Sequence, residues 1–303
     1  MKNYPTDMLD FVDMFPTEES CLEYISSIRW PDGYECKRCQ SVEYWTTARG
    51  LFHCCKCDYE SSVTSGTLFH GTRKPHRFWF HAIWYVVNQK NGVSALGLQK
   101  ALGFGSYHTA WKWLHKLRRA MVRSGRDRLS GYVEMDEAFV GGERKGKRGR
   151  GAEGKALVLV AVENKDGIIG RIRLSIIPDA SGKSIKDATL EMIEPGSTIN
   201  SDGWDGYNLL TKHGYIHAPL THVKSASGDA TPLAHHIIAL LKRWWLGTHQ
   251  GAISPEHLAY YLDEFTFRFN RRTSKSRGKL FYRLIEQALQ IDPIPANTII
   301  HKI

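Results

Sequence analysis

Apolar and polar positions change their spacing several times along the chain, and the first changes mark out a small module. Residues 7–28 have the spacing of short helices, with Thr17 as an N-cap ahead of Glu18 and Glu19, whose charges favour the positive end of a helix. Over residues 30–70, aromatic side chains are spaced as short strands. The pattern predicts helices followed by a strand-containing unit that is too small to bury a large core.

Helical spacing returns over residues 76–122. His76–Asn88 and Ser94–Leu102 predict two helices, and Ser106 begins a third after the break at residues 103–105. Helix, glycine turn and helix form the outline of a helix-turn-helix. The last helix carries basic side chains that suit contacts with DNA phosphates, namely Lys112, Lys116, Arg118 and Arg119. An ordinary helical hairpin with a solvated basic face fits the same pattern, so both interpretations stay open.

Strand patterns dominate the chain after Gly131. The predicted strands are Tyr132–Phe139, Ala156–Val162, Ile168–Ile177, residues 197–201 and one within 215–223. The predicted helices are residues 181–193, residues 205–213, Pro232–Leu246 and Pro255–Phe269. Three strands, helix, strand, helix, strand and then helices is the order of a ribonuclease-H-like domain, so the sequence predicts an α/β fold here.

A glycine-rich basic loop, residues 141–155, joins the first two of these strands. It carries six basic residues, two acidic residues and six glycines. Its basic side chains predict an arm that becomes ordered on a phosphate backbone, and they include Arg144, Lys145, Lys147, Arg148 and Arg150. A solvated hairpin loop is the alternative.

Composition limits the classes of protein that fit. The chain has 303 residues, enough for two or three domains, and 42% of them are hydrophobic. The longest apolar run, Ala156–Val162, is too short to span a bilayer, and the first residues lack the apolar core of a signal peptide, so we expect a soluble cytosolic protein. A net charge of +10 favours a polyanionic partner such as nucleic acid.

The cysteines predict a metal site. All six lie within the first 57 residues, and Cys36, Cys39, Cys54 and Cys57 form two Cys-x-x-Cys pairs. Two such pairs suit tetrahedral binding of one structural Zn²⁺ by four thiolates, and in a small unit the metal supplies folding energy. A pair of disulfides in a secreted domain is the alternative.

Acidic side chains in the strand region are candidates for chemistry. Strand alternation places Glu134 and Asp136 on one face and Met135 and Glu137 on the other. A buried carboxylate is costly unless it is solvated or binds a cation, although an edge strand with a wet face fits as well. Asp202 ends a short apolar strand, and sites collect at strand ends in open α/β sheets.

His235 lies on the polar side of a predicted helix. The apolar stripe of that helix passes through Leu233, Ile237 and Leu241, whereas His235 and Lys242, seven residues apart, share the opposite side. The pattern is consistent with surface decoration or with a site residue paired with a lysine. Two aspartates and one further ligand suffice to hold two divalent cations, which catalyse in-line phosphoryl displacement.

Taken together, these segments resemble the bacterial insertion-sequence transposases of the ISXO-like group, which join a zinc ribbon to a DDE-type catalytic domain. The likeness covers nearly the whole chain. Besides the paired cysteines, the matching segments are Phe15-Pro-Thr-Glu-Glu19, Arg29-Trp-Pro-Asp-Gly33, Thr64-Ser-Gly-Thr67, Val133-Glu-Met-Asp-Glu137 with Gly141-Gly142, Ser201-Asp-Gly-Trp-Asp-Gly-Tyr207, Leu241-Lys-Arg-Trp-Trp-Leu-Gly-Thr-His-Gln250 and Tyr261-Leu-Asp-Glu-Phe-Thr-Phe-Arg-Phe-Asn-Arg-Arg272.

The resemblance implies a catalytic triad of Asp136, Asp202 and His235. The third member lies seven residues before a basic residue on a helix, here Lys242, and relatives carry glutamate, asparagine or histidine at that position. Asp136 would bridge two ions, with Asp202 and His235 each holding one. Neutral imidazole suits Mn²⁺ better than Mg²⁺, so the resemblance leaves open which of the two is the catalytic ion.

The implied reaction has two steps. Water hydrolyses a phosphodiester at the end of the element, and the freed 3′ hydroxyl then attacks target DNA, with Lys242 at a phosphate near the scissile bond. Arg271 and Arg272 would support or grip DNA, while packing and capping at a helix end is the alternative for both. The partners would be double-stranded DNA at element ends and target, and a homodimer or larger synaptic assembly, nucleoid-associated in a bacterial cytoplasm.

The resemblance also implies three domains. Residues 1–72 would form N-terminal helices and the zinc ribbon, residues 73–125 a helix-turn-helix-like DNA-binding segment, and residues 126–303 the ribonuclease-H-like transposase domain.

Two other functions compete with a transposase. A DNA-binding regulator with an inactive nuclease-like domain fits the missing third carboxylate, and a zinc-ribbon nuclease of repair would cleave without strand transfer. Asp263 and Glu264 are alternative third ligands.

Overall fold

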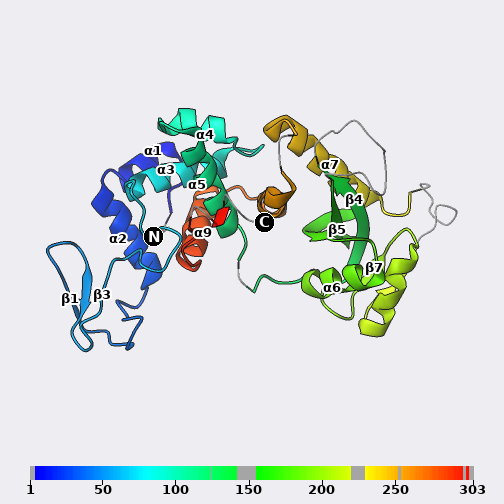
Figure 1. The fold of residues 1–303 in the computed structure, drawn as a ribbon, viewed down its shortest axis with the longest axis horizontal. Helices are drawn as coiled ribbons and strands as arrows, with labels where there is room; N and C mark the ends of the chain where they lie inside the picture. The colour runs from blue at the N-terminus through cyan, green and yellow to red at the C-terminus, as the bar shows by residue number, and fades with distance from the viewer. Residues whose placement is uncertain are drawn as a thin grey trace. The chain divides into compact units, whose positions relative to one another are not determined.

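The computed structural model describes residues 4–123, 125–141, 155–219, 229–251, 254–295 and 298–299 (Figure 1). The chain divides into two compact units. Unit 1 consists of Met1–Arg123 together with Ser274–Lys302, and unit 2 is centred on Ser124–Thr273. The final segment therefore packs with the N-terminal part of the chain, whereas the sequence-based boundaries placed it with the catalytic domain.

Unit 1 contains a small sheet and six helices among its described residues. The helices are α1 (Met8–Met14), α2 (Glu18–Arg29), α3 (His76–Asn88), α4 (Ala95–Leu102), α5 (Tyr107–Ala120) and α9 (Arg277–Leu289). Strands β1 (Tyr44–Thr46), β2 (Phe52–Cys54) and β3 (Glu60–Ser61) form an antiparallel sheet in that order. Thr17 caps α2 as predicted, because its side chain accepts a hydrogen bond from the Ser20 amide.

The core of unit 1 is aromatic, and α9 completes it. Phe281 of α9 lies within ring contact of Phe11, Phe80 and Trp84 from α1 and α3. Nothing in the sequence interpretation anticipated this helix. Its apolar face covers α2, α3 and α5, which need a partner to bury their own apolar stripes.

The predicted basic face of α5 is narrower than expected. The indole of Trp113 stacks on Trp79 of α3, and the same helix packs against α9 on another side. As a result Arg118 is buried, with 2% of its surface exposed, and it is not part of an open surface as predicted. Lys112 and Lys116 are half-buried and Arg119 is exposed. Gly103 ends α4 in the left-handed conformation (φ +63°), which makes the turn into α5 possible.

Unit 2 is built on a five-stranded mixed sheet. Strands β4 (Tyr132–Val140), β5 (Ala156–Lys165) and β6 (Ile168–Ile177) are consecutive and antiparallel. Strands β7 (Thr198–Asn200) and β8 (Ile216–His217) continue the sheet parallel to β4, so the strand order is β6-β5-β4-β7-β8. The predicted α/β, ribonuclease-H-like order is therefore confirmed.

Helices cover both faces of this sheet. They are α6 (Gly182–Met192), α7 (Pro232–His249) and α8 (Leu258–Asn270), with short 3₁₀ helices η1 (Asp205–His213) and η2 (Pro255–His257). Ala138 and Val140 of β4 share a core with α7 and α8, whereas Val133 and Met135 share a core with α6 and η1. Figure 1 shows α7 and α6 on opposite sides of the sheet. Because side chains alternate along a strand, Glu134 and Asp136 lie on the face covered by α7.

The basic loop residues Arg144, Lys145, Lys147, Arg148 and Arg150 lie outside the described part of the chain. None of the helices that are described is long and apolar enough to cross a bilayer.

Candidate active site and zinc site

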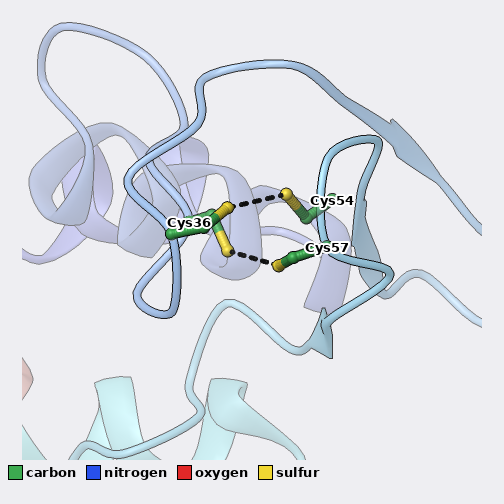
Figure 2. A group of neighbouring side chains, drawn as sticks. Cys36, Cys54 and Cys57 are labelled. Carbon is green, nitrogen blue, oxygen red and sulfur yellow. Dashed lines mark hydrogen bonds between the residues drawn. The ribbon is translucent and has the colours of Figure 1, made fainter.

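The four paired cysteines converge between two turns of the ribbon in unit 1. Figure 2 shows Cys36, Cys54 and Cys57 facing one another. The Sγ atoms of Cys36 and Cys57 lie 3.6 Å apart, and those of Cys39 and Cys54 lie 3.5 Å apart. A tetrahedral Zn²⁺ with Zn–S bonds of about 2.3 Å holds its sulfurs about 3.8 Å apart. The four thiols therefore fit one zinc ion, and all remain free of disulfides.

Backbone amides also prepare the cysteines for a cation. Burial opposes ionisation of Cys36, but amides of Cys39 and Arg38 directed at its sulfur lower the pKa of Cys36 to about 6. Burial and hydrogen bonds with the neighbouring sulfurs raise the pKa of Cys57 to about 12. Cys55 lies in the same turn but is exposed, so it is not one of the ligands.

The ribbon has little apolar core of its own. Tyr34 is buried beside Cys36 and Cys54, and Trp30 and Phe52 pack around them. A core this small does not offset the entropy of ordering about thirty residues, so the folding of the ribbon depends on the metal.

In unit 2, strand register brings the two predicted aspartates to neighbouring strands. Strands β4 and β7 are parallel, and Glu134 pairs with Asn200. Two residues further on, β4 reaches Asp136 while the chain leaving β7 reaches Asp202. Asp136 keeps 15% of its side chain exposed, whereas Asp202 is exposed and accepts a hydrogen bond from the Trp204 amide at 3.0 Å.

His235 contacts Asp136 directly. It lies in the first turn of α7, and its Nε2 is 3.0 Å from the Asp136 Oδ2. Its Nδ1 is 2.9 Å from the carboxylate of Asp229, a residue just ahead of the helix. The imidazole is thus held between two carboxylates, and its role as a site residue stays a prediction.

The charges of this cluster oppose one another. Burial, helped by the negative charges of Asp202 and Asp229, raises the pKa of Asp136 despite the opposing effect of His235. Burial disfavours the charged form of His235, but Asp229 and Asp136 outweigh it and raise the pKa of His235 above its usual value. Two carboxylates contact the imidazole, and the charge of Asp202 acts on Asp136, so these acids form an anionic cluster that favours a cation.

Carboxylate oxygens and an imidazole nitrogen suit Mg²⁺ or Mn²⁺. The 3.0 Å between the Asp136 and His235 atoms matches adjacent ligands of an octahedral ion, which are about 3 Å apart at bond lengths of about 2.1 Å. Among the residues that the structure describes, however, the four cysteines are the one set of three or more ligand atoms within 4.8 Å of one another. Asp136 and His235 are therefore close enough to share one ion, whereas the ligand atoms of Asp136, Asp202 and His235 do not all lie within 4.8 Å of one another.

Two further residues that the sequence analysis named lie on helices α7 and α8. Lys242 is exposed on α7, two helical turns after His235. Glu264, an alternative third ligand, is buried with 1% exposed, and its carboxylate accepts a hydrogen bond from Arg268 at 2.8 Å.

The basic end of α8 is engaged with the protein itself. The guanidinium of Arg271 lies over the ring of Phe267 and that of Arg272 over Phe269, each at 4.1 Å. Arg272 also donates to backbone carbonyls of β6, at Gly170 and Ile169. Both arginines thus pack and cap, and contact with DNA stays a prediction for them.

Sequence patterns missed one acid of this site, Asp229, and the burial of a second acid beside it, Glu137. Asp229 belongs to no regular element, so periodicity does not mark it. Glu137 lies on the α6 face of β4, where burial raises the pKa of Glu137 to about 7, the hydroxyl of Tyr207 opposes that rise, and the charge of Asp136 adds to it. The position of Glu137 on an alternating strand marks it as a candidate acid. The strand pattern does not show, however, that η1 covers its side chain.

Family models match most of unit 2 and the ribbon part of unit 1. Residues 128–270 match the model of the ISXO2-like transposase domain, and residues 16–60 match that of the transposase zinc-ribbon domain. The first match includes Asp136, Asp202, His235 and Lys242, and the second includes the four paired cysteines.

One curated relative and two solved structures are similar to the chain. An uncharacterized protein in transposable element ISH50 of Halobacterium salinarum is 26% identical over 295 residues, covering 88% of this chain and 95% of the relative. A simian T-cell lymphotropic virus intasome complexed with PP2A regulatory subunit B56 gamma aligns over 59% of this chain and 66% of its own, with 14% identity and a TM-score of 0.32. The Mos1 strand transfer complex aligns over 73% and 78%, with 14% identity and a TM-score of 0.29. Scores this low carry no functional weight.

Proposed function

Because the chain belongs to the insertion-sequence transposases that join a zinc ribbon to an ISXO2-like transposase domain, we propose that it cleaves DNA at the ends of its element and transfers the freed strand to a target. The observation that supports this most is the contact of His235 with Asp136, one strand away from Asp202. It provides an anionic cluster at the position where the family carries its catalytic acids.

Divalent ions, when bound by Asp136, Asp202 and His235, supply activation of the attacking oxygen and stabilisation of the leaving oxygen. In the first step a water oxygen forms a bond to phosphorus while the bond to the 3′ oxygen breaks, and that oxygen takes a proton. In the second step the freed 3′ hydroxyl loses its proton to water and its oxygen forms a bond to the phosphorus of a target phosphodiester, while the bond to the 3′ oxygen of the target strand breaks and that oxygen takes a proton. Asp229 holds the imidazole of His235 with Nδ1 occupied and Nε2 directed at the ligand position, as a partner of metal-bound histidine does.

The partner is double-stranded DNA. The exposed ammonium of Lys242 contacts a phosphate near the scissile bond, and the zinc ribbon with the α4–α5 hairpin reads the terminal repeats. The net charge of +10 supports such a polyanionic partner. Paired ends require a dimer or a larger assembly on DNA.

Replacement of His235 tests the function. We expect His235→Ala to lower Mn²⁺-dependent cleavage and joining of a labelled duplex carrying the element end by about 10²-fold or more, because one ligand of the ion is lost. His236→Ala is the matched control, since it removes the next imidazole, which is also exposed but points about 100° away along the helix.

The outcomes separate the candidate functions. Cleavage that His235→Ala removes and His236→Ala keeps supports the transposase with a histidine as third ligand. Cleavage that survives both variants places the third ligand elsewhere. A wild-type protein that binds the end and cuts it with neither Mn²⁺ nor Mg²⁺ is a regulator.

Replacement of Asp229 changes the pH dependence. In Asp229→Ala, we expect the cleavage maximum to fall by about 10- to 100-fold, because the ring of His235 loses its orientation. The pKa of His235 also falls towards its usual value, since the charge that raises it is gone. Protonated imidazole does not bind a metal ion, so the acid limb of the pH–rate profile moves to lower pH. An acid limb that stays in place would show that Asp229 does not act on His235.

A further inference from the structure

The first turn of α7 has an unusual source of capping. Helices leave their first N–H groups without partners inside the helix, and the N-cap residue commonly satisfies one of them. In α7 the N-cap Thr231 makes no side-chain capping bond, and Pro232 at the first position has no N–H. The His235 amide already bonds the Thr231 carbonyl at 2.9 Å. The free donors that remain at this end are the amides of Leu233 and Ala234.

Glu134 takes both of these donors. Its Oε2 accepts from the Leu233 amide at 2.8 Å and from the Ala234 amide at 3.2 Å, although the residues are 99 and 100 positions apart in the chain. The other oxygen, Oε1, accepts from the Asn164 Nδ2 of β5 at 3.3 Å. Asn164 is fixed as a donor because its own Oδ1 accepts from the Gly167 amide at 2.7 Å.

The burial of the Glu134 carboxylate needs a physical explanation. Glu134 is 4% exposed, and burying a carboxylate is costly unless its oxygens are satisfied. Here the positive end of the helix and three N–H donors satisfy it. Apart from the pair of Asp136 and His235, the rest of the contact between β4 and α7 is apolar, formed by residues such as Ala138, Ala234 and Ile237. Apolar contacts carry little directional preference, whereas hydrogen bonds set the helix at one position along the strand.

We propose that Glu134 is the positioning residue of the active site, the side chain that pins the first turn of α7 to β4 and thereby presents His235 to Asp136. The inference rests on the proposed function for its effect on catalysis. Two neighbouring pairs connect the same strand and helix, namely Glu134 with the amides of Leu233 and Ala234, and Asp136 with His235. α7 lies against β4 at this point (Figure 1).

Hydrogen exchange tests, independently of catalytic activity, whether Glu134 holds the first turn of α7 against β4. In Glu134→Gln, which keeps the shape of the side chain and one acceptor, we expect the Leu233 and Ala234 amides to exchange at least about tenfold faster, with the rest of unit 2 unchanged. Glu163→Gln is the matched control. Glu163 is 3% exposed on the neighbouring strand β5 and also accepts two backbone amides, from Arg171 and Ser130, but it does not contact α7 amides. The loss of its charge should speed exchange near Arg171 and Ser130 and leave the Leu233 and Ala234 amides unchanged.

Kinetics on the end-carrying duplex test the consequence. We expect Glu134→Gln to lower the rate constant for cleavage by about 10-fold and Glu134→Ala by about 100-fold, with unchanged affinity for the duplex, because a small displacement of a catalytic group costs rate rather than binding. Glu163→Gln should leave both unchanged. The Mn²⁺ affinity of Glu134→Gln, measured by calorimetry, should fall as well.

Each failure has its own meaning. Unchanged exchange at Leu233 and Ala234 in Glu134→Gln overturns the pin. Faster exchange with a normal cleavage rate overturns the positioning role and leaves a structural cap. A wild-type protein that never cleaves rejects the proposed function, while exchange and Mn²⁺ binding still decide whether Glu134 pins α7. Should Glu134→Ala fold poorly in thermal melts, Glu134→Gln and its exchange pattern decide alone.

Discussion

Asp136→Asn is expected to abolish DNA cleavage and joining while leaving the protein folded and able to bind DNA. The substitution keeps the size of the side chain and removes one negative charge from the group at the centre of the cluster. A loss of about 10³-fold or more in rate, roughly 4 kcal/mol of transition-state stabilisation, follows if this carboxylate holds the catalytic ions. Cleavage of a labelled element end with Mn²⁺ or Mg²⁺ measures it.

Stability separates this effect from a folding defect. Burial and two neighbouring acids raise the pKa of Asp136, so its charge is disfavoured in the folded state. An acid with a raised pKa destabilises the fold at pH values above that pKa, and removal of the charge relieves this penalty. Asp136→Asn should therefore melt at the same temperature as wild type, or higher, at neutral pH.

Asp205→Asn makes the same change of charge at an exposed position of η1 and should keep full activity. An Asp136→Asn protein that still cleaves at more than a tenth of the wild-type rate would remove Asp136 from the reaction.

Cys54→Ser is expected to release zinc and unfold the ribbon. Cys54 is fully buried, and its sulfur lies 3.5 Å from that of Cys39. Without the metal, four aromatic side chains and a three-stranded sheet of very short strands do not offset the chain entropy. Zinc content should fall from about one ion per chain to almost none, and hydrogen exchange over residues 30–61 should become rapid.

Loss of the ribbon should also remove recognition of the element end. We expect affinity for the end to fall to that for random duplex DNA, a loss of about 10³-fold, because sequence-specific complexes are tighter than non-specific ones by at least this factor. Cys55→Ser is the matched control, since Cys55 lies in the same turn with an exposed side chain. Full zinc content in Cys54→Ser would show that another residue completes the site.

Local patterns predicted the regular elements well, because their causes are local. Thr17 caps α2 as expected, and His76–Asn88 is a helix at the predicted bounds. Predictions were weaker where a neighbour distant in sequence decides burial. Arg118 was assigned to an open basic face, but α5 is covered on more than one side and α9, which covers part of it, was not anticipated.

In the candidate site, too, local patterns predicted some features and missed the contacts between residues that are distant in sequence. Strand alternation placed Glu134 and Asp136 on one face, and the structure shows that face covered by α7. No pattern connected Glu134 to Leu233, because that contact joins residues 99 positions apart through the packing of a helix on a sheet. The sequence did not indicate Asp229 either, because Asp229 lies outside any periodic element. Its contact with His235 forms only when α7 is packed in place.

The sequence by itself indicated the four paired cysteines as zinc ligands, the order of strands and helices in unit 2, and the likeness to a transposase family. The spacing of the cysteines and the alternation of side chains along a strand each involve only a few neighbouring residues. Local backbone geometry is therefore enough to place these side chains. Only the tertiary structure decided which carboxylates face His235, which acid caps α7 and which arginines are buried. These contacts depend on how whole elements pack, and packing sums many small contributions from residues that are far apart in the chain.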